Sequence, residues 1–339
     1  MLINALSFKF WCTLFFHTLL FSPLLANKFA WPTANQSYLK NQSPENYIQP
    51  TISGKLISGY FGCVRSEGRQ FHEGLDLKAI QHDQRGESTD EVFAFTAGKV
   101  VYINDVAWKS TYGKYVVIEH SSLNLPVYSL YAHLRSIDRA LMVGTMVLSG
   151  QVIGILGRTA SYPIPKRRAH LHWEIGIRYT NAFGDWYQAK KFKSPNYHGI
   201  WNGQNLGGID PLAFFSFCQK ELSPKAFFNK LPRALTLRVS TSKVPDFCIR
   251  YLIMVTDDII KNDLTGWEVS FTWNGVPVEW KPLYSQQHPL EKGGTIRIVR
   301  YEKELIETNQ CRKLLSFSSG KPHATATLKN ILQLLFGFN

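Results

Sequence analysis

Short runs of β-branched and aromatic residues, separated by glycine, recur along most of the first two thirds of this chain. The runs cover residues 56–61, 92–103, 115–119, 127–131, 146–148, 152–156 and 171–177. Runs of this length with glycine between them, and without a helical period, favour β-strands. The sequence therefore predicts an all-β fold of antiparallel strands, arranged as a sheet or a barrel-like structure.

The chain is long enough for two domains. It has 339 residues, of which 45% are hydrophobic and 19% charged, so it can bury a sizeable core. We expect a first domain over residues 51–219 and a smaller, sandwich-like β domain over residues 220–339. The strands expected in the second domain are 234–239, 248–255, 267–273, 276–280 and 295–301.

Two stretches of the second domain carry signals of local structure: a turn sequence and an apolar run near the C-terminus. Asn274-Gly275, between two alternating segments, predicts a β-hairpin. The apolar stretch 331–338 is compatible either with packing against a sheet or with a short amphipathic helix. Nothing in residues 220–339 carries a recognisable catalytic motif.

The N-terminal residues have the character of a secretory signal. Lys9 precedes an apolar run that closes on Ala26, which predicts a signal peptide over residues 1–26 that is removed after Ala26. An uncleaved membrane anchor is the alternative. Residues 27–50 are rich in Asn, Gln, Ser and Pro and predict a flexible segment. We expect export to the periplasm, the cell envelope or the medium, with no integral membrane span after signal removal.

Cysteine usage agrees with export. Four cysteines follow residue 26, namely Cys63, Cys218, Cys248 and Cys311. An even number in an exported protein permits two disulfides, with three possible pairings that the sequence leaves open. None lies beside a histidine motif, so we interpret them as structural.

The net charge of +13 indicates an anionic partner. The charge is spread over both expected domains rather than gathered in a tail, which suits a cell-wall or outer-membrane surface. No motif that reads DNA or RNA is present, and we expect no nucleic-acid partner. The oligomeric state is left open.

Three separated pieces of sequence supply metal-binding side chains. Side chains alternate faces along a strand, so His170 and His172 project to the same side, about 6.5–7 Å apart. His72 and Asp76 are four residues apart and share a face by the same rule, with Gly74 between them. His133 ends an apolar, aromatic run.

Together these pieces supply three nitrogen or oxygen ligands and two spare imidazoles. That is the stoichiometry of a catalytic zinc site that keeps a fourth position for water. A single histidine at a strand end, such as His133 or His120, is more often structural. The joint occurrence of the three pieces in one domain favours the metal site.

Residues 55–215 resemble the lysostaphin and β-lytic family of zinc metallopeptidases, murein endopeptidases with a duplicated-hybrid-motif β fold. The resemblance rests on segments in the expected order: His72-Glu73-Gly74-Leu75-Asp76, Gly98-Lys99-Val100-Val101-Tyr102, Tyr112-Gly113 through His120, Tyr131-Ala132-His133-Leu134, Gly150 through Gly154, and His170-Leu171-His172-Trp173-Glu174-Ile175. It implies one Zn²⁺ per chain, held by His72, Asp76 and His172. It also implies that His133 and His170 are the catalytic imidazoles, without deciding which is the general base.

One segment departs from the family. A glycine- and hydroxyl-rich turn is usual before the histidine pair, whereas residues 158–168 contain two prolines and end in Lys166, Arg167 and Arg168. These cations either attract carboxylates of a stem peptide or form a solvated basic loop. The aromatic stretch 178–208 either forms a wall of the active-site groove or packs over the sheet.

The sequence thus predicts an exported zinc metalloendopeptidase that hydrolyses peptide bonds of peptidoglycan stems or cross-links. A zinc endopeptidase with a protein substrate is the first alternative. An inactive wall-binding activator is the second, and it is disfavoured because all five site residues are present.

Overall fold

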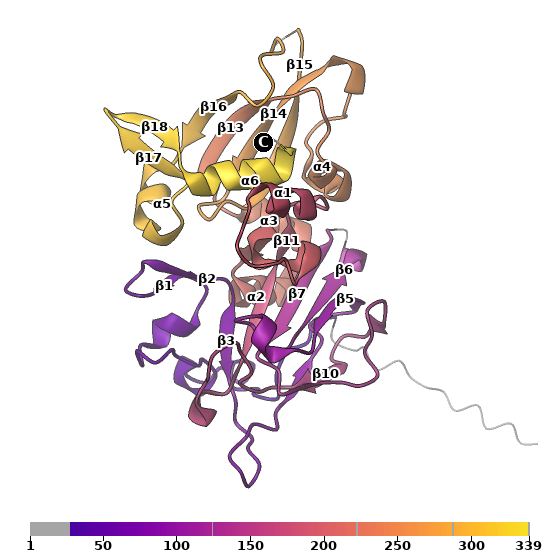
Figure 1. Cartoon of the computed structure of the whole chain (residues 1–339), viewed down its shortest axis with the longest axis vertical. Helices are drawn as coiled ribbons and strands as arrows, with labels where there is room; N and C mark the ends of the chain where they lie inside the picture. Colours follow the sequence, from indigo (N-terminus) through magenta and orange to yellow (C-terminus); the bar gives the residue numbers. More distant parts are fainter. Residues whose placement is uncertain (1–27, 124, 222, 287, 338–339) are drawn as a thin grey trace, which may run out of the picture.

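The computed structural model describes residues 28–337 except residues 124, 222 and 287 (Figure 1). The predicted signal peptide therefore lies outside the described residues. Within the described residues, no helix has the length and apolar character needed to cross a bilayer.

Antiparallel strands dominate the first part of the chain, which confirms the all-β prediction. The strands are β1 (Gly62–Arg65), β2 (Gln70–His72), β3 (Leu75–Lys78), β4 (Glu91–Phe93), β5 (Gly98–Asn104), β6 (Tyr115–His120), β7 (Val127–Ala132), β8 (Ser136–Ile137), β9 (Met146–Val147), β10 (Val152–Ile155), β11 (His170–Arg178) and β12 (Leu206–Ile209). The main sheet has the order β12-β11-β7-β6-β5-β9, and β3 pairs with β11 beside β12. Strands β4, β10 and β8 form a second sheet, and β1 pairs with β2.

Strand β11 is the centre of the main sheet because three strands pair with it. It lies against β7 along one edge, and β3 and β12 share the other edge. All nine of its residues are buried. Leu171, Trp173, Ile175 and Ile177 join the main hydrophobic core. By alternation, His170, His172 and Glu174 project to the opposite face.

That opposite face is partly covered by the segment after β11. The segment contains α1 (Phe183–Ala189) and ends in β12. Trp201 and Leu206 pack there with Tyr115, Tyr128 and Leu130 in a separate apolar cluster. The aromatic stretch 178–208 therefore packs over the sheet on the side that carries the histidines.

Residues 28–50 are not a flexible segment, and that prediction is wrong. Phe29 and Trp31 are buried, and the Trp31 ring packs against Trp173 and Phe215 of the core. The backbone also pairs with β3, because Gln49 N–H donates to Asp76 O at 2.9 Å. Polar composition suggested disorder, but a few aromatic side chains supply enough buried apolar area to order the segment.

Two expected strands are helical. Residues 56–61 contain a 3₁₀ turn (Leu56–Gly59), where the Ser58 hydroxyl donates to Lys55 O and accepts from Thr51 N–H. Such local side-chain bonds compete with strand pairing. Residues 248–255 fall in α4 (Asp246–Arg250) and a 3₁₀ turn (Leu252–Met254).

The C-terminal part has one four-stranded antiparallel sheet of order β15-β14-β13-β16 and the hairpin β17-β18. Its elements are α2 (Pro211–Glu221), α3 (Pro224–Lys230), β13 (Leu235–Ser240), β14 (Leu264–Phe271), β15 (Pro277–Tyr284), β16 (Ile296–Tyr301), α5 (Lys303–Thr308), β17 (Leu315–Ser318), β18 (Lys321–Ala324) and α6 (Ala326–Phe336). The Asn274-Gly275 hairpin is present, and Gly275 has the positive φ of 88° that the turn needs.

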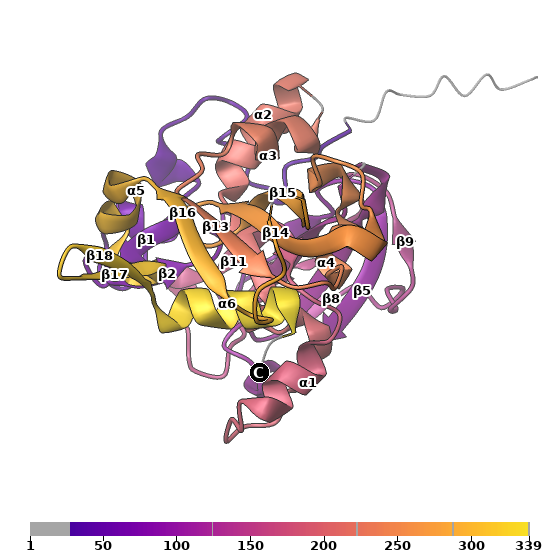
Figure 2. The ribbon, with the colours of Figure 1, turned by 90° about the horizontal axis from the view of Figure 1, so that it is seen from above.

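Helix α6 lies across this sheet, where the sandwich-like expectation placed a second sheet (Figure 2). Leu328, Ile331, Leu332 and Leu335 are buried, and the Phe336 ring lies 5.4 Å from that of Trp280 on β15. The open question about residues 331–338 is thus answered by a helix over residues 326–336. The main core is continuous between the two parts of the chain. A division into domains at residue 219 stays a prediction.

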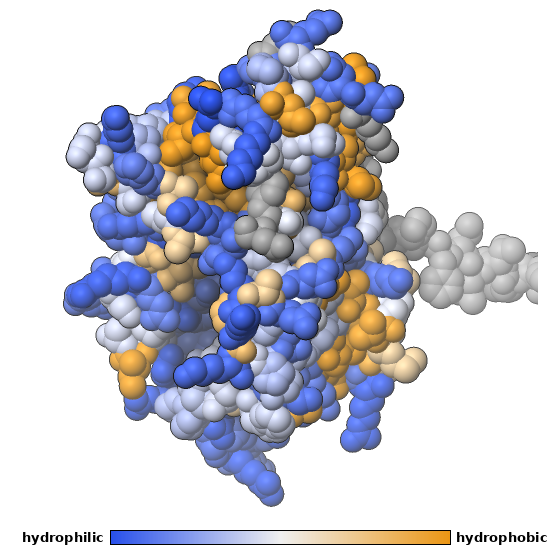
Figure 3. All heavy atoms as spheres, turned by 45° about the horizontal axis from the view of Figure 1, so that its top comes forward, coloured by the Kyte–Doolittle hydropathy of each residue, from blue (hydrophilic) through white to orange (hydrophobic). Residues whose placement is uncertain are grey.

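One disulfide links the two parts. Cys63 on β1 is bonded to Cys311, and Cys218 and Cys248 are buried free thiols. The face of the molecule drawn in Figure 3 is largely hydrophilic, with apolar residues gathered in several patches.

Candidate metal centre

Three side chains that the sequence singled out converge on the covered face of the main sheet. His72 ends β2, Asp76 lies on β3 and His172 lies on β11. The pairing of β3 with β11 sets His172 directly opposite Asp76. Gly74 makes this approach possible, because a Cβ there would lie 2.5 Å from Trp173 O and 3.0 Å from His172 Cε1.

The three ligand atoms form an almost equilateral triangle. His72 Nε2 lies 3.1 Å from His172 Nδ1 and 3.1 Å from Asp76 Oδ1, and His172 Nδ1 lies 3.1 Å from the same oxygen. All three residues are buried. Among the described residues, this trio is the group of His, Cys, Asp and Glu whose ligand atoms converge as a metal site requires.

The outer nitrogens of both imidazoles are already hydrogen-bonded. His72 Nδ1–H donates to Tyr60 O at 2.6 Å, and His172 Nε2–H donates to Glu174 Oε1 at 2.9 Å. When both imidazoles are neutral, the inner nitrogens present lone pairs to each other and to Asp76. Facing lone pairs at 3.1 Å repel unless a cation or a proton lies between them, so the residues present fit a metal ion.

The electrostatics of the trio also favour a positive charge at its centre. Burial raises the pKa of Asp76, but the imidazoles of His72 and His170 outweigh it and hold that pKa well below its usual value. Arg65 Nη2 donates to Asp76 Oδ2 at 2.5 Å, which leaves Oδ1 for the centre. Burial lowers the pKa of His172, yet its hydrogen bonds to Asp76 and Glu174 raise the pKa to about 9.

The two remaining histidines lie beside the trio. The ring of His133 is 4.7 Å from that of His170 and 6.0 Å from that of His172. His133 Nδ1–H donates to Thr159 O at 2.8 Å, and His170 Nδ1–H donates to Arg168 O at 2.7 Å. Both Nε2 atoms are thereby left as acceptors, and His170 Nε2 lies 3.7 Å from Asp76 Oδ1.

Both of these imidazoles are held in the neutral form. Burial lowers the pKa of His133 well below its usual value, and His170 and His172 lower it further. Burial likewise lowers the pKa of His170, against the opposing effect of Asp76. His133 also has a φ of 62°, the left-handed region that non-glycine residues seldom occupy. Backbone strain of this kind is concentrated at functional sites.

A family model described as Peptidase family M23 matches residues 70–183, the segment that contains all five of these side chains. These residues form a peptidase family M23 domain. The recognition made from the sequence motifs is therefore confirmed.

Several solved structures of peptidases are similar to the chain. A zinc-containing peptidase from Vibrio cholerae is 28% identical, with a TM-score of 0.27, over 38% of this chain and 33% of that chain. The catalytic domain of the antimicrobial peptidase lysostaphin from Staphylococcus simulans is 18% identical, with a TM-score of 0.31, over 51% and 95%. A putative glycyl-glycine endopeptidase, lytM, from Ruminococcus gnavus is 25% identical, with a TM-score of 0.27, over 32% and 40%.

The match to the first of these spans about a third of its length. A comparison with curated proteins found no match.

Sequence reasoning missed the residues that orient the three side chains of the candidate metal centre. Glu174 carried a signal, because it lies two positions after His172 and so shares its face. Tyr112 donates to Glu174 Oε1 and its ring lies 5.3 Å from that of His172. The contacts of Tyr60 O and Arg65 depend on the fold of the β1–β2 region, and no sequence pattern marks them.

The basic loop before β11 is partly paired in the structure. Lys166 Nζ donates to Arg85 O at 2.6 Å and lies 3.5 Å from Glu87 Oε1. Arg158 holds the same carboxylate by two hydrogen bonds. Lys166 therefore belongs to a surface ion-pair network of the M23 domain, and the attraction of substrate carboxylates by this loop stays a hypothesis.

Proposed function

We propose that the chain is an exported zinc metalloendopeptidase that hydrolyses peptide bonds of peptidoglycan. The observation that carries this proposal is the triangle of three buried acceptor atoms 3.1 Å apart, with two neutral imidazoles beside it. The M23 match over the same residues supports it. Export is inferred from the apolar run before Ala26.

The donor set suits zinc. Two imidazole nitrogens and one carboxylate oxygen are usual ligands of catalytic Zn²⁺, with bonds of about 2.0–2.2 Å. Ligand atoms at such distances in a tetrahedron lie about 3.3–3.6 Å apart, a few tenths of an ångström more than the 3.1 Å observed here. We assign His72 Nε2, Asp76 Oδ1 and His172 Nδ1 as the ligands of one ion per chain. A bound zinc ion supplies Lewis acidity, which polarises a peptide carbonyl and acidifies water.

His133 and His170 supply the proton transfers in this proposal. Each is neutral and presents Nε2, so either can accept a proton from water. The other, once protonated, can donate a hydrogen bond to the oxyanion of the tetrahedral intermediate and a proton to the leaving amine. The hydrogen bonds to Thr159 O and Arg168 O fix the orientations of the two rings. They do not decide which imidazole is the general base and which is the general acid.

Peptidoglycan is the preferred substrate class for two reasons. The net charge of +13 favours an anionic polymer, and two of the similar solved structures are a lysostaphin catalytic domain and a putative glycyl-glycine endopeptidase. A protein substrate is the alternative, since no wall-binding repeat is present in the sequence.

The ligand assignment predicts different effects for two substitutions. His172→Ala should lose both zinc and activity because it removes one of three ligands. His133→Ala should retain zinc and lose most turnover because it removes only a proton-transfer group. Metal analysis and a rate assay on each purified variant measure both effects. Full activity in either variant would refute the assignment.

The substrate class is decided by digesting purified sacculi and casein side by side, with and without a chelator. Mass spectrometry of fragments released from sacculi identifies the bond that is cleaved. We expect chelator-sensitive release of muropeptides and little digestion of casein. The reverse pattern would establish a protein substrate in place of peptidoglycan.

A further inference from the structure

Exposed apolar side chains gather around β9, the strand at one edge of the main sheet, which Figure 2 shows on the outside of the molecule. Four large side chains there are 64–72% exposed, namely Met142, Val143, Met146 and Leu148. Elsewhere in the described part of the chain, large apolar side chains with high exposure occur singly or in pairs. Single apolar side chains on a surface are ordinary, whereas a group of four within residues 142–148 indicates contact with an apolar partner.

Two turns, one on either side of β9, present these side chains. In the first turn, Met142 N–H donates to Thr145 Oγ1 at 3.0 Å and Thr145 N–H donates to Met142 O at 3.0 Å. In the second turn, Leu148 N–H donates to Gln151 Oε1 at 3.0 Å and Gln151 N–H donates to Leu148 O at 3.1 Å. Backbone that enters a lipid surface must satisfy its own polar groups, because water is scarce there. The first and last N–H groups of both turns meet this requirement.

Three exposed cations accompany the apolar group. Lys99 on β5 lies directly opposite Met146 in the register, so the two side chains share a face of the sheet. Arg139 precedes the first turn, and Lys28 O accepts a hydrogen bond from Thr96 Oγ1 at 2.6 Å, close to the start of β5. Among the residues that the structure describes, none of these three cations forms an ion pair. Their charges are therefore available to an anionic partner.

The acidic residues near these cations have other contacts. Glu119 lies opposite Lys99 on β6, but its carboxylate is 3.6 Å from Arg178 Nη2. Asp138 Oδ1 accepts a hydrogen bond from Ala140 N–H at 2.8 Å. The cations outnumber the acids along this edge, so its exposed charge is positive.

The N-terminal end of the described chain lies beside the second turn. A Cβ at Gly150 would lie 3.7 Å from Ala30 Cβ, so the segment that starts at Lys28 contacts this turn. In the sequence, only Asn27 separates Lys28 from Ala26, where the apolar run closes. Whenever a bilayer holds that run, as a signal peptide or as an anchor, its surface lies within a few residues of Lys28 and close to the turns that flank β9.

We propose that this edge of the main sheet is a membrane-contact face that rests on an anionic lipid bilayer. The face consists of residues 142–148 together with Lys28, Lys99 and Arg139. The four exposed apolar side chains enter the boundary between headgroups and acyl chains, and the three cations contact lipid phosphates. The protein thereby stays at the lipid surface after removal of its signal peptide. This proposal does not depend on the peptidase function.

A protein partner fits the membrane-contact face less well than a bilayer does. Strand β9 has two residues, so its free edge offers few backbone groups for pairing with another strand. The centre of a protein interface is depleted of charged residues, yet Lys99 lies directly beside Met146. At a bilayer, Met146 can enter the apolar layer while Lys99 remains at the level of the phosphates.

Vesicle binding by residues 27–339 tests the proposal. The apolar run before Ala26 is left out because it would itself insert into lipid, and all described residues lie within this range. Co-sedimentation compares vesicles of phosphatidylethanolamine and phosphatidylglycerol with vesicles of phosphatidylcholine alone. We expect binding to the anionic vesicles that weakens as salt is added, and little binding to the neutral vesicles.

One pair of substitutions tests the apolar side chains. Met146→Ser with Leu148→Ser opens no cavity, because both side chains are exposed. Loss of two partly inserted side chains should lower the partition coefficient for anionic vesicles about tenfold. Ile52→Ser with Ile57→Ser is the matched control, since these side chains are 82% and 55% exposed near β3, at the opposite edge of the main sheet. The control should stay within about twofold of the wild type.

A second pair of substitutions tests the cations. Lys99→Gln with Arg139→Gln should weaken binding to the anionic vesicles about thirtyfold at low salt, because each cation near an anionic surface contributes roughly fivefold. Both side chains are exposed, so the fold should be unaffected.

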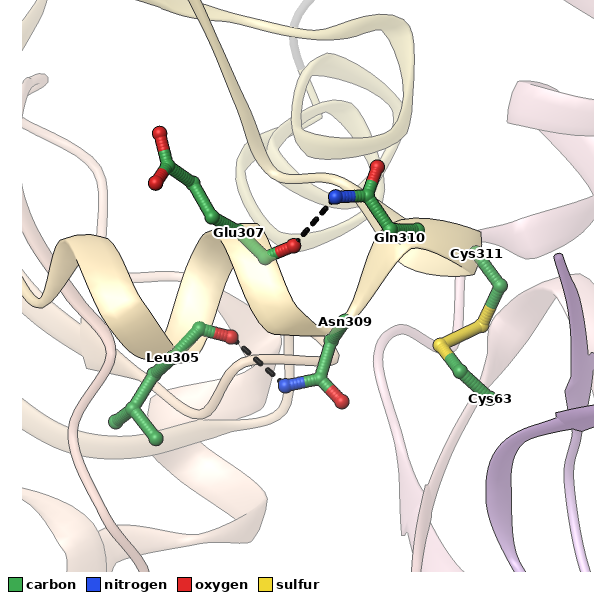
Figure 4. Close-up of a disulfide and its surroundings, with 6 residues drawn as sticks. All are labelled: Cys63, Leu305, Glu307, Asn309, Gln310 and Cys311. Atoms are coloured by element: carbon green, nitrogen blue, oxygen red, sulfur yellow. Dashed lines mark hydrogen bonds between the residues drawn. A yellow bond between two sulfur atoms is a disulfide. The ribbon is translucent and has the colours of Figure 1, made fainter. Parts of the chain in front are cut away.

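Lys313→Gln with Lys321→Gln is the matched control for charge, because it changes the net charge by the same amount at exposed positions. Lys313 follows Cys311, whose disulfide to Cys63 joins this region to β1 (Figure 4). Strand β1 pairs with β2, which leads to β3 at the edge of the main sheet opposite β9. This control should weaken binding by no more than about threefold, since its charges lie away from the membrane-contact face.

Three outcomes would overturn the proposal. The first is no binding of the wild-type protein to anionic vesicles. The second is equal loss in the two serine pairs or in the two glutamine pairs, because general hydrophobicity or net charge would then explain binding. The third is a wild-type dimer in sedimentation velocity without lipid that Met146→Ser with Leu148→Ser converts to a monomer, because a second copy of the chain would then cover this face.

Discussion

Glu174 determines which nitrogen of His172 faces the candidate metal centre. It accepts hydrogen bonds from His172 Nε2–H at 2.9 Å and from the Tyr128 hydroxyl at 3.2 Å, and it also accepts from Tyr112. The carboxylate is buried and cannot turn away. A carboxylate in this position fixes the tautomer of the ligand and raises its basicity.

Replacement of that carboxylate should weaken metal binding. Glu174→Gln removes the negative charge and should lower zinc affinity by about 10–100-fold. Competition with a chromophoric chelator measures the affinity. Glu91→Gln, an exposed carboxylate on β4, serves as the control. Unchanged zinc affinity in Glu174→Gln would contradict the orienting role.

His120 is a histidine with a structural role, unlike the histidines of the candidate metal centre. Its Nδ1–H donates to Ala97 O at 3.0 Å, and its Nε2 lies 2.7 Å from the Ser129 hydroxyl, so both nitrogens are satisfied. Complete burial lowers its pKa to about 4. The sequence could not separate His120 from His133 by pattern, because only the fold shows which imidazole retains a free acceptor.

The lowered pKa of His120 predicts a pH dependence of stability. The unfolded chain takes up a proton near pH 6.5 and the folded chain only near pH 4. The free energy of unfolding should therefore fall as pH decreases between these values, by about 3 kcal/mol from this group. Denaturant titrations at pH 7 and pH 4.5 measure it. His120→Gln should show a weaker dependence, whereas exposed His82→Gln should match the wild type; equal dependence in all three would refute the prediction.

At the scale of elements, the segment before residue 50 belongs to the folded core. Trp31 contacts Tyr38, Tyr47, Trp173 and Phe215 through its ring. Backbone pairing of residues 47–49 with β3 also supports the strand that carries Asp76. The segment therefore contributes to the position of a candidate metal ligand.

Truncation of this tryptophan should destabilise the protein strongly. Trp31→Ala should lower the free energy of unfolding by about 3–5 kcal/mol, because it opens a cavity between aromatic rings. Leu39→Ala, whose side chain is 46% exposed, should change it by no more than about 0.5 kcal/mol. Denaturant melts of both variants provide the comparison. A small effect of Trp31→Ala would restore the flexible-segment interpretation.

Elements with a strong period of two were predicted well, and the errors have local causes. Strands β6, β7 and β11 lie where alternation and glycine boundaries indicated. Helix α4 was missed although Phe247, Cys248, Tyr251 and Met254 are buried at helical spacing after Pro245. β-branched residues and aromatics in that stretch favoured a strand, and the short apolar run does not discriminate between the two.

At the scale of the whole molecule, the Cys63–Cys311 disulfide closes a loop with a sequence separation of 248 residues. Oxidation should stabilise the protein by about 2–5 kcal/mol, since the link restricts the unfolded chain. The free energy of unfolding is compared with and without reductant. A Cys63→Ser, Cys311→Ser double variant should not respond to reductant. The same stability of the oxidised and reduced wild-type protein would contradict this expectation.

The sequence by itself determined the β class, the M23 resemblance and the side chains that face one another. Side-chain alternation on strands and the spacing of His72, Asp76, His170 and His172 are local properties, so they can be read without coordinates. The tertiary structure decided what depends on contacts between distant segments. These are the choice of Cys311 as the partner of Cys63, the burial of residues 28–50, and the hydrogen bonds that turn two imidazole lone pairs toward one carboxylate. Each of these contacts joins residues that are far apart in sequence. Because such contacts form only when the other elements are in place, they depend on the whole fold.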